Sequence, residues 1–175
     1  MKKISRLPLY LGLSVLVLSV LVTSVTVGQK RNVALQRSRA STTTANLSLQ
    51  FTSPRTVSVL INSPVDVSGI DIVLKYDKDK FTILPSSLSS GDQFITTGGK
   101  LDKGSSTFSF SAIAKSDVKN TIAATFSVRS LTPKIATSGN LTFELGPDKT
   151  VILDKSSGQN ILGNAGGVNL TIPAQ

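Results

Sequence analysis

From Asn46 to the end of the chain, apolar residues recur at every second position in one short run after another. Side chains of a β-strand point alternately to its two faces, so each run predicts a strand with one buried and one solvated face. The clear runs lie at residues 47–51, 57–61, 70–76, 108–110, 122–128, 141–145 and 168–172. In each run the apolar members are expected to point inward together, Ile122 and Leu145 included.

Turn-forming residues separate these runs, as in Asn62-Ser63-Pro64 and Gly146-Pro147-Asp148. Weaker runs near residues 81–84 and 150–153 bring the count to about nine strands. Helical periodicity is nearly absent from this part of the sequence. We therefore predict an all-β domain over residues 46–175, an antiparallel β-sandwich with jelly-roll topology. A domain of this length can bury a core without help from a second one.

Residues 7–27 follow a different pattern, with 21 residues in a row that carry no charge. As a helix this run would span about 30 Å, the thickness of a bilayer's hydrocarbon core. Secretory signal peptides have shorter apolar stretches and a small-residue cleavage site, for which Thr26-Val27-Gly28 is the nearest candidate. The pattern favours one uncleaved transmembrane helix, and secretion after signal cleavage is the alternative.

The charge of +9 is concentrated beside this apolar run. Residues 1–45 hold seven Lys and Arg and no acid, so residues 46–175 carry twelve basic side chains against ten acidic ones. We interpret residues 1–6 as a basic cytoplasmic tail, and residues 28–45 as a polar, basic linker with too little apolar surface to fold alone. The domain at residues 46–175 would then lie outside the cell membrane. Its near-neutral charge argues against nucleic acid as a partner.

Composition excludes several kinds of chemistry. The sequence contains no Cys and no His. Disulfides, zinc sites of the usual kind, a Cys nucleophile and a Ser-His-Asp triad are therefore ruled out. A glycosidase needs two carboxylates in matched environments, but Glu144 is the only Glu and most Asp residues fall in predicted turns. We expect no enzymatic activity.

The order of short motifs along residues 54–173 resembles that of the cohesin module. Thr56-Val57-Ser58-Val59 opens a strand, and the run from Gly69 to Asp77, GIDIVLKYD, alternates and ends in Tyr-Asp as in that family. Further matches follow in sequence order at residues 81–83, 104–113, 122–128 and 167–172. The resemblance implies a nine-stranded jelly-roll sandwich related to cellulose-binding modules. It also implies that the domain binds a dockerin module, whose own residues hold any calcium.

The resemblance, together with the alternation, suggests a binding face. On the run at residues 70–76, Asp71, Val73 and Lys75 share the side opposite the apolar residues. The corresponding cohesin strand belongs to the sheet that receives dockerin. A mixed charged and apolar face also suits a protein partner, although an ordinary solvated sheet face remains an alternative.

Asp77 and Asp79 are the strongest candidates for metal ligands, but the alternating Lys78 and Lys80 would neutralise the negative charge of such a site. We expect Tyr76 to be a core residue, Asp77 to start a turn by bonding its own backbone, and no metal or other cofactor. Asp148 and Asp154 are likewise expected to shape turns.

The sequence thus predicts a membrane-anchored, non-catalytic module that recognises a protein partner of the dockerin type in a polysaccharide-degrading or cell-surface assembly. One alternative is a surface module that binds polysaccharide. Such modules normally use exposed aromatic rings, and the Phe residues here mostly fall on the inward side. A structural or adhesive protein of the envelope is the other alternative.

Overall fold

The structure, a computed structural model, describes residues 44–174, which belong to a compact unit from Thr43 to Gln175. The predicted tail, transmembrane segment and most of the linker, residues 1–43, lie outside the described residues. Within the described part, no helix has the length and apolar character needed to cross a membrane.

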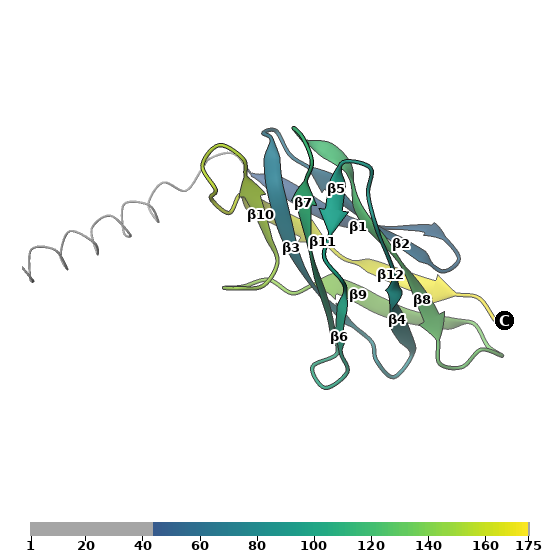
Figure 1. The fold of residues 1–175 in the computed structure, drawn as a ribbon. Coiled ribbons are helices and arrows are strands. Elements are labelled where there is room, and N and C mark those ends of the chain that lie inside the picture. Colours follow the sequence, from purple (N-terminus) through teal and green to yellow (C-terminus); the bar gives the residue numbers. More distant parts are fainter. Residues whose placement is uncertain (1–43, 175) are drawn as a thin grey trace, which may run out of the picture. The chain divides into compact units, whose positions relative to one another are not determined.

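Two β-sheets pack face to face (Figure 1). The five-stranded sheet has the order β11-β1-β2-β8-β4, and the seven-stranded sheet has the order β12-β9-β3-β7-β5, with β10 paired to β3 and β6 paired to β7. The strands are β1 (Ala45–Ser53), β2 (Thr56–Asn62), β3 (Val67–Tyr76), β4 (Phe81–Ser90), β5 (Phe94–Thr96), β6 (Lys100–Asp102), β7 (Thr107–Ala114), β8 (Asn120–Ser130), β9 (Thr137–Phe143), β10 (Val151–Asp154), β11 (Leu162–Gly166) and β12 (Val168–Ile172). The prediction of an all-β sandwich is confirmed.

The described residues contain three strands more than the sequence predicted, namely β5, β6 and β11. β5 and β6 have three residues each, too few to establish a period of two. β11 has the sequence LGNAG, which lacks alternation, and it pairs with β1 in parallel. The other strand pairs are antiparallel, as predicted.

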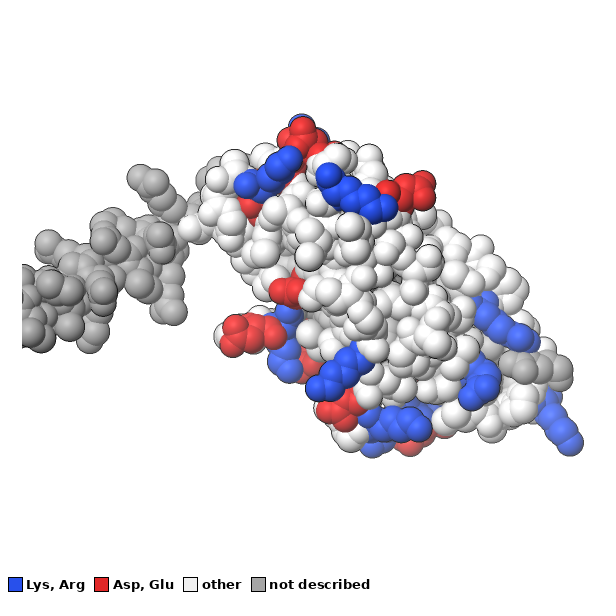
Figure 2. Space-filling model, in the orientation of Figure 1, with Lys and Arg blue, Asp and Glu red and all other residues white. Residues whose placement is uncertain are grey.

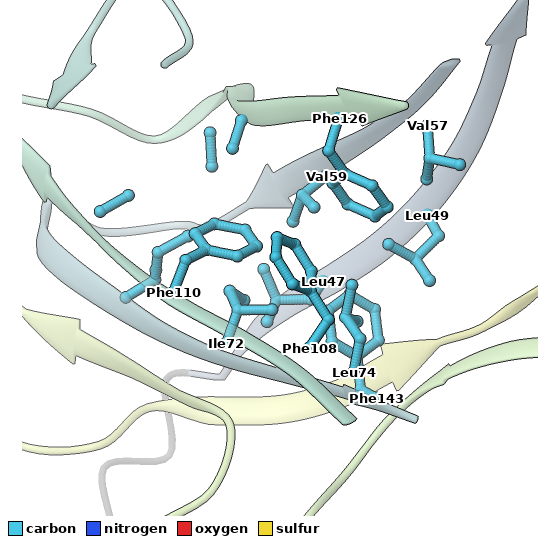
Figure 3. Close-up of a cluster of buried hydrophobic side chains, with 14 of the residues drawn as sticks. Leu47, Leu49, Val57, Val59, Ile72, Leu74, Phe108, Phe110, Phe126 and Phe143 are labelled. Atoms are coloured by element: carbon cyan, nitrogen blue, oxygen red, sulfur yellow. The ribbon is translucent and has the colours of Figure 1, made fainter. Parts of the chain in front are cut away.

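The core lies between the sheets and is rich in phenylalanine (Figure 3). Phe108 on β7 and Phe126 on β8 are both buried, and their ring centroids lie 5.3 Å apart. These strands belong to different sheets, so this contact joins the two layers directly. A tilted aromatic pair of this kind adds about 1 kcal/mol to the burial of its area.

Two residues expected to point inward are exposed, and these predictions were wrong. Ile122 is 38% exposed because a bulge in β8 places Ala123 and Ala124 in succession against the core, which reverses the alternation. At this bulge the Gly91 N–H donates to the Ala123 carbonyl over 2.9 Å. Leu145 is 58% exposed because β9 ends at Phe143, so the alternation does not reach it.

Candidate functional site

The three predicted binding residues lie on the outer face of β3. Asp71 and Lys75 are exposed and Val73 is partly exposed, while their neighbours Ile72 and Leu74 are buried. Alternation along a strand of ten residues is sufficient to produce this arrangement. Asp71 and Val73 line a groove on this face, whereas Lys75 lies outside it.

Strand register sets the neighbours of these residues. Asp71 lies opposite Ser111 of β7 and Val151 of β10, and the Ser111 hydroxyl donates to Asp71 Oδ1 over 2.5 Å. Val73 lies opposite Ser109, which in turn faces Lys100 of β6. Acidic, hydroxyl, apolar and basic groups therefore lie next to one another on three neighbouring strands, β3, β7 and β6.

The groove across this face has a volume of about 540 Å³. Asp71, Val73, Ser109 and Ser111 form its floor, and its flanks come from two connections, one at residues 97–100 and the other at residues 148–151. The first connection joins β5 to β6, which the hydrophobic pattern did not predict, and the second leads from β9 into β10, which it predicted weakly. The groove is therefore a product of the tertiary fold.

A buried threonine holds one flank of the groove against β3. Thr150 is 2% exposed, accepts a hydrogen bond from the Val73 N–H and donates one to the Val73 carbonyl, each over 3.1 Å. Val73 lies where the edge of β3 changes partner, from β10 on one side to β9 on the other. Thr150 thus satisfies backbone groups that neither strand reaches.

The same flank carries the only glutamate. The Glu144 N–H donates to the Val73 carbonyl over 2.7 Å, and Glu144 Oε1 lies 3.3 Å from Lys149 Nζ. Glu144 Oε2 is buried without a hydrogen-bond partner. Glu144 was expected on the outward side of a strand, but it follows the end of β9 and anchors the connection to β10.

One end of the outer face is apolar. Ile113 of β7 and Ile95 of β5 lie opposite each other and are each 58% exposed. Ile113 also faces Gly69 of β3, which lies opposite the partly exposed Leu153 of β10. Sequence reasoning missed these isoleucines, although the alternation of residues 107–111 would have placed Ile113 outward had it been extended. The face seen in Figure 2 has a broad area without charged side chains.

Asp77, one of the two carboxylates weighed as metal candidates and expected to form a turn, does lie in a turn. The Asp77 carbonyl accepts hydrogen bonds from the N–H groups of Lys80 and Phe81, each over 3.1 Å, and its carboxylate pairs with Lys80 Nζ at 2.9 Å. The predicted turn is therefore present, but the Asp77 backbone rather than its side chain closes it. Tyr76 is buried, as expected. Among the described residues, no cluster of three or more acidic, His or Cys side chains could hold a metal ion.

Asp154 also shapes a turn, as predicted. Its carboxylate accepts hydrogen bonds from the Ser157 hydroxyl and from the N–H and hydroxyl of Ser156. These bonds favour the ionised form, with the one from the Ser157 hydroxyl contributing most, and they lower the pKa of Asp154. Asp148 lies in the connection before β10 with a positive φ of 59°.

The aromatic side chains of the described residues face the core. Seven of the eight are buried, and Phe51 packs against the core while partly exposed. Sugar rings bind proteins by stacking on exposed aromatic faces. The outer face of β3 carries aliphatic and polar groups and no exposed aromatic ring on which a sugar could stack.

Comparison with known proteins agrees with this architecture. The fold is similar to a type II cohesin domain from the cellulosome of Acetivibrio cellulolyticus, at 14% identity and a TM-score of 0.56 over 73% of this chain and 95% of that one. It is also similar to a non-cellulosomal cohesin from Archaeoglobus fulgidus, at 13% identity and a TM-score of 0.57 over 75% of this chain and 93% of that one. A third match, from a type I cohesin–dockerin complex of Clostridium thermocellum, has 12% identity and a TM-score of 0.52 over 73% of this chain and 94% of that one.

No protein-family model and no curated protein sequence matches the chain. Similarity to solved structures at this level of identity establishes the fold. Residues 44–174 therefore have the cohesin fold, a jelly-roll β-sandwich, as the order of motifs in the sequence predicted.

Proposed function

We propose that this chain is a non-catalytic recognition module that binds a protein partner through the outer face of its seven-stranded sheet. The observation that carries this proposal is the groove over Asp71, Val73, Ser109 and Ser111, together with the exposed Ile113 farther along β7 on the same face. Protein interfaces combine an apolar centre with polar groups at the rim, and this face has both. The apolar side chains of Val73, Ile95, Ile113 and Leu153, exposed or partly exposed next to hydrogen-bonding groups, suit a folded partner better than solvent.

We propose a dockerin-type module as the partner. Two of the solved structures with the same fold are described as cohesins in complex with dockerins, one of type I and one of type II. The archaeal cohesin of the same fold is described as non-cellulosomal, so this partner need not belong to a cellulosome. In this proposal any calcium is bound by the partner, and the module contributes Asp71, Val73 and Lys75 to the contact.

We also propose that residues 7–27 anchor the module in the cell membrane, with the folded domain outside. The support is the length of the uncharged run, which matches a bilayer, and the basic residues on both sides of it. The predicted linker up to the start of the compact unit at Thr43 would separate the domain from the membrane and leave the groove accessible to a second protein.

The first experiment is a pull-down with residues 43–175, the compact unit, against the organism's secreted proteins and against an isolated dockerin module. Each capture is carried out with calcium and with a chelator. We expect capture of a dockerin-containing protein in calcium alone. The double variant Asp71→Ala, Lys75→Ala should weaken capture about thirtyfold, since it removes two polar contacts that each contribute about 1 kcal/mol.

The matched control is Gln50→Ala with Thr125→Ala, two polar residues on the outer face of the other sheet. This pair should leave capture unchanged. Equal loss in both double variants would assign binding to neither face. If no protein is captured but the domain is retained on insoluble polysaccharide, carbohydrate binding would replace the proposal. If the domain neither captures a protein nor is retained on polysaccharide, a structural or adhesive role in the envelope would replace it.

A further inference from the structure

A second hollow lies away from the groove, at the end of the sandwich where β3 turns into β4 and β6 turns into β7 (Figure 1). It has a volume of about 390 Å³. Leu84, Leu101 and Leu131 supply aliphatic side chains to its lining, and Leu131 is 49% exposed. A partly exposed leucine at the mouth of a pocket offers apolar area that a ligand can cover.

Three basic side chains surround this apolar lining. Lys78 comes from the turn after β3, Lys103 from the turn after β6, and Arg129 from β8. All three are exposed, and none forms an ion pair with another residue in the described part of the chain. They are therefore available to an anionic ligand.

The acids near the pocket only partly offset this charge. Asp79 lines the pocket, and Asp102 lies close enough to add to the rise that burial causes in the pKa of Tyr76. Asp102 is occupied within its own turn, where Oδ1 accepts hydrogen bonds from the N–H groups of Gly104, over 2.8 Å, and Ser105, over 3.3 Å. The basic excess at the pocket remains.

The same excess extends over the whole end of the domain. Residues 75–80, 100–103 and 129–134 hold seven basic and three acidic side chains, whereas the other described residues hold five basic and seven acidic ones. The near-neutral domain is thus polarised, and blue side chains predominate toward the lower end of the view in Figure 2. A polarised surface steers partners of opposite charge.

We propose that this pocket is a second recognition site, which binds an acidic peptide segment with an apolar side chain next to its carboxylate. Arg129, Lys103 and Lys78 would pair with the carboxylate, and the leucines would cover the apolar side chain. An acidic polysaccharide would meet the same charges. The two aromatic rings in the lining, Tyr76 and Phe81, are only 5% and 0% exposed, so the accessible apolar surface comes from the leucines and favours the peptide. This site is independent of the face proposed to bind dockerin.

The test uses the full chain in a nonionic detergent and a fluorescein-labelled peptide of alternating Leu and Glu, followed by fluorescence anisotropy. We expect saturable binding that weakens as salt is added, because exposed charges are screened. The double variant Lys103→Gln, Arg129→Gln should lower the affinity about tenfold. Leu131→Ser should lower it by a smaller factor, about threefold.

The matched control is Lys115→Gln with Lys119→Gln, which removes the same charge from exposed positions elsewhere and should leave the affinity unchanged. Asp71→Ala, which lies in the groove and outside the basic end, should also leave it unchanged, and this separates the site from the proposed dockerin face. Absence of binding would overturn the proposal. An equal loss of affinity in the Lys103→Gln, Arg129→Gln variant and in the Lys115→Gln, Lys119→Gln control would overturn it too. Equally tight binding of a Ser/Glu peptide or of oligogalacturonate would show that the leucines play no part, and would overturn it as well.

Discussion

The two sheets of this domain present different outer faces, although both arise from the same alternation. On the five-stranded sheet the outward positions of β1 are Asn46, Ser48 and Gln50. Of their partners on β2, Asn62 is exposed, whereas Ser58 is only 1% exposed. On the seven-stranded sheet the outward positions carry charges, exposed isoleucines and a groove. Short amides and hydroxyls suit water, whereas the second combination suits a partner.

This difference shows that a period of two locates outer faces without distinguishing between them. Both faces contain an apolar pair, Leu60 with Ile122 on one and Ile95 with Ile113 on the other. The pair on the seven-stranded sheet is more exposed, and the groove lies on the same face. The two faces can therefore be tested against each other, residue for residue.

The outer faces of the two sheets can be compared only if the sheets fold as one cooperative unit. The Phe108→Ala variant tests this and should have the largest effect. Phe108 is fully buried and contacts Phe126 of the other sheet. Its truncation should lower the free energy of unfolding by about 4 kcal/mol. Urea unfolding followed by circular dichroism should show one transition, shifted to lower urea. Two separate transitions would mean that the sheets are independent.

The bulge at Ala123 in the five-stranded sheet packs closely against the backbone of Gly91. A Cβ on this residue would lie 1.8 Å from the Ile122 carbonyl oxygen, which is backbone and has little room to move. We expect Gly91→Ala to destabilise the fold by about 3 kcal/mol. Gly98→Ala is the matched control, because no atom lies within 4 Å of its Cβ position, and it should change stability by less than about 0.5 kcal/mol. Similar thermal midpoints for the two variants would contradict this account.

The two apolar pairs allow a direct test of which face binds. Ile113→Ser should weaken binding of a dockerin module about tenfold, or about 1.4 kcal/mol, because it removes apolar area from the proposed interface. Ile122→Ser, on the opposite face, should leave the affinity unchanged. Isothermal titration calorimetry gives both values. A greater loss for Ile122→Ser would transfer the binding face to the five-stranded sheet.

The smallest expected effect concerns an exposed ion pair between two loops. Lys155 Nζ lies 2.5 Å from Asp117 Oδ1, and its hydrogen bond, followed by its charge, lowers the pKa of Asp117. The ion pair therefore adds stability that is fully present above about pH 4 and is lost as the pH falls through the lowered pKa. Lys155→Met should slightly reduce stability at neutral pH and make the decline below pH 4 shallower, as measured by urea unfolding at several pH values. An unchanged pH profile would mean that solvent already screens the pair.

The longer strands and the buried positions of β3 were predictable because a sustained period of two has one physical cause, burial of a single face. Asp71, Val73 and Lys75 were placed on the outer face for the same reason. Such a local rule fails where the chain departs from regular geometry. Ile122 turns outward because of a bulge at which the backbone of Gly91, distant in sequence, donates a hydrogen bond to the Ala123 carbonyl.

The amino-acid sequence by itself determined the fold class, the neutral charge of the domain and the side of β3 that faces outward. Only the tertiary structure decided that short connections from residues 97–100 and 148–151 flank the groove, and that Lys78, Lys103 and Arg129 surround one pocket. The physical reason is that alternation records the burial of each residue along its own strand. Grooves and pockets depend on which strands become neighbours, and residues far apart in the sequence settle that together.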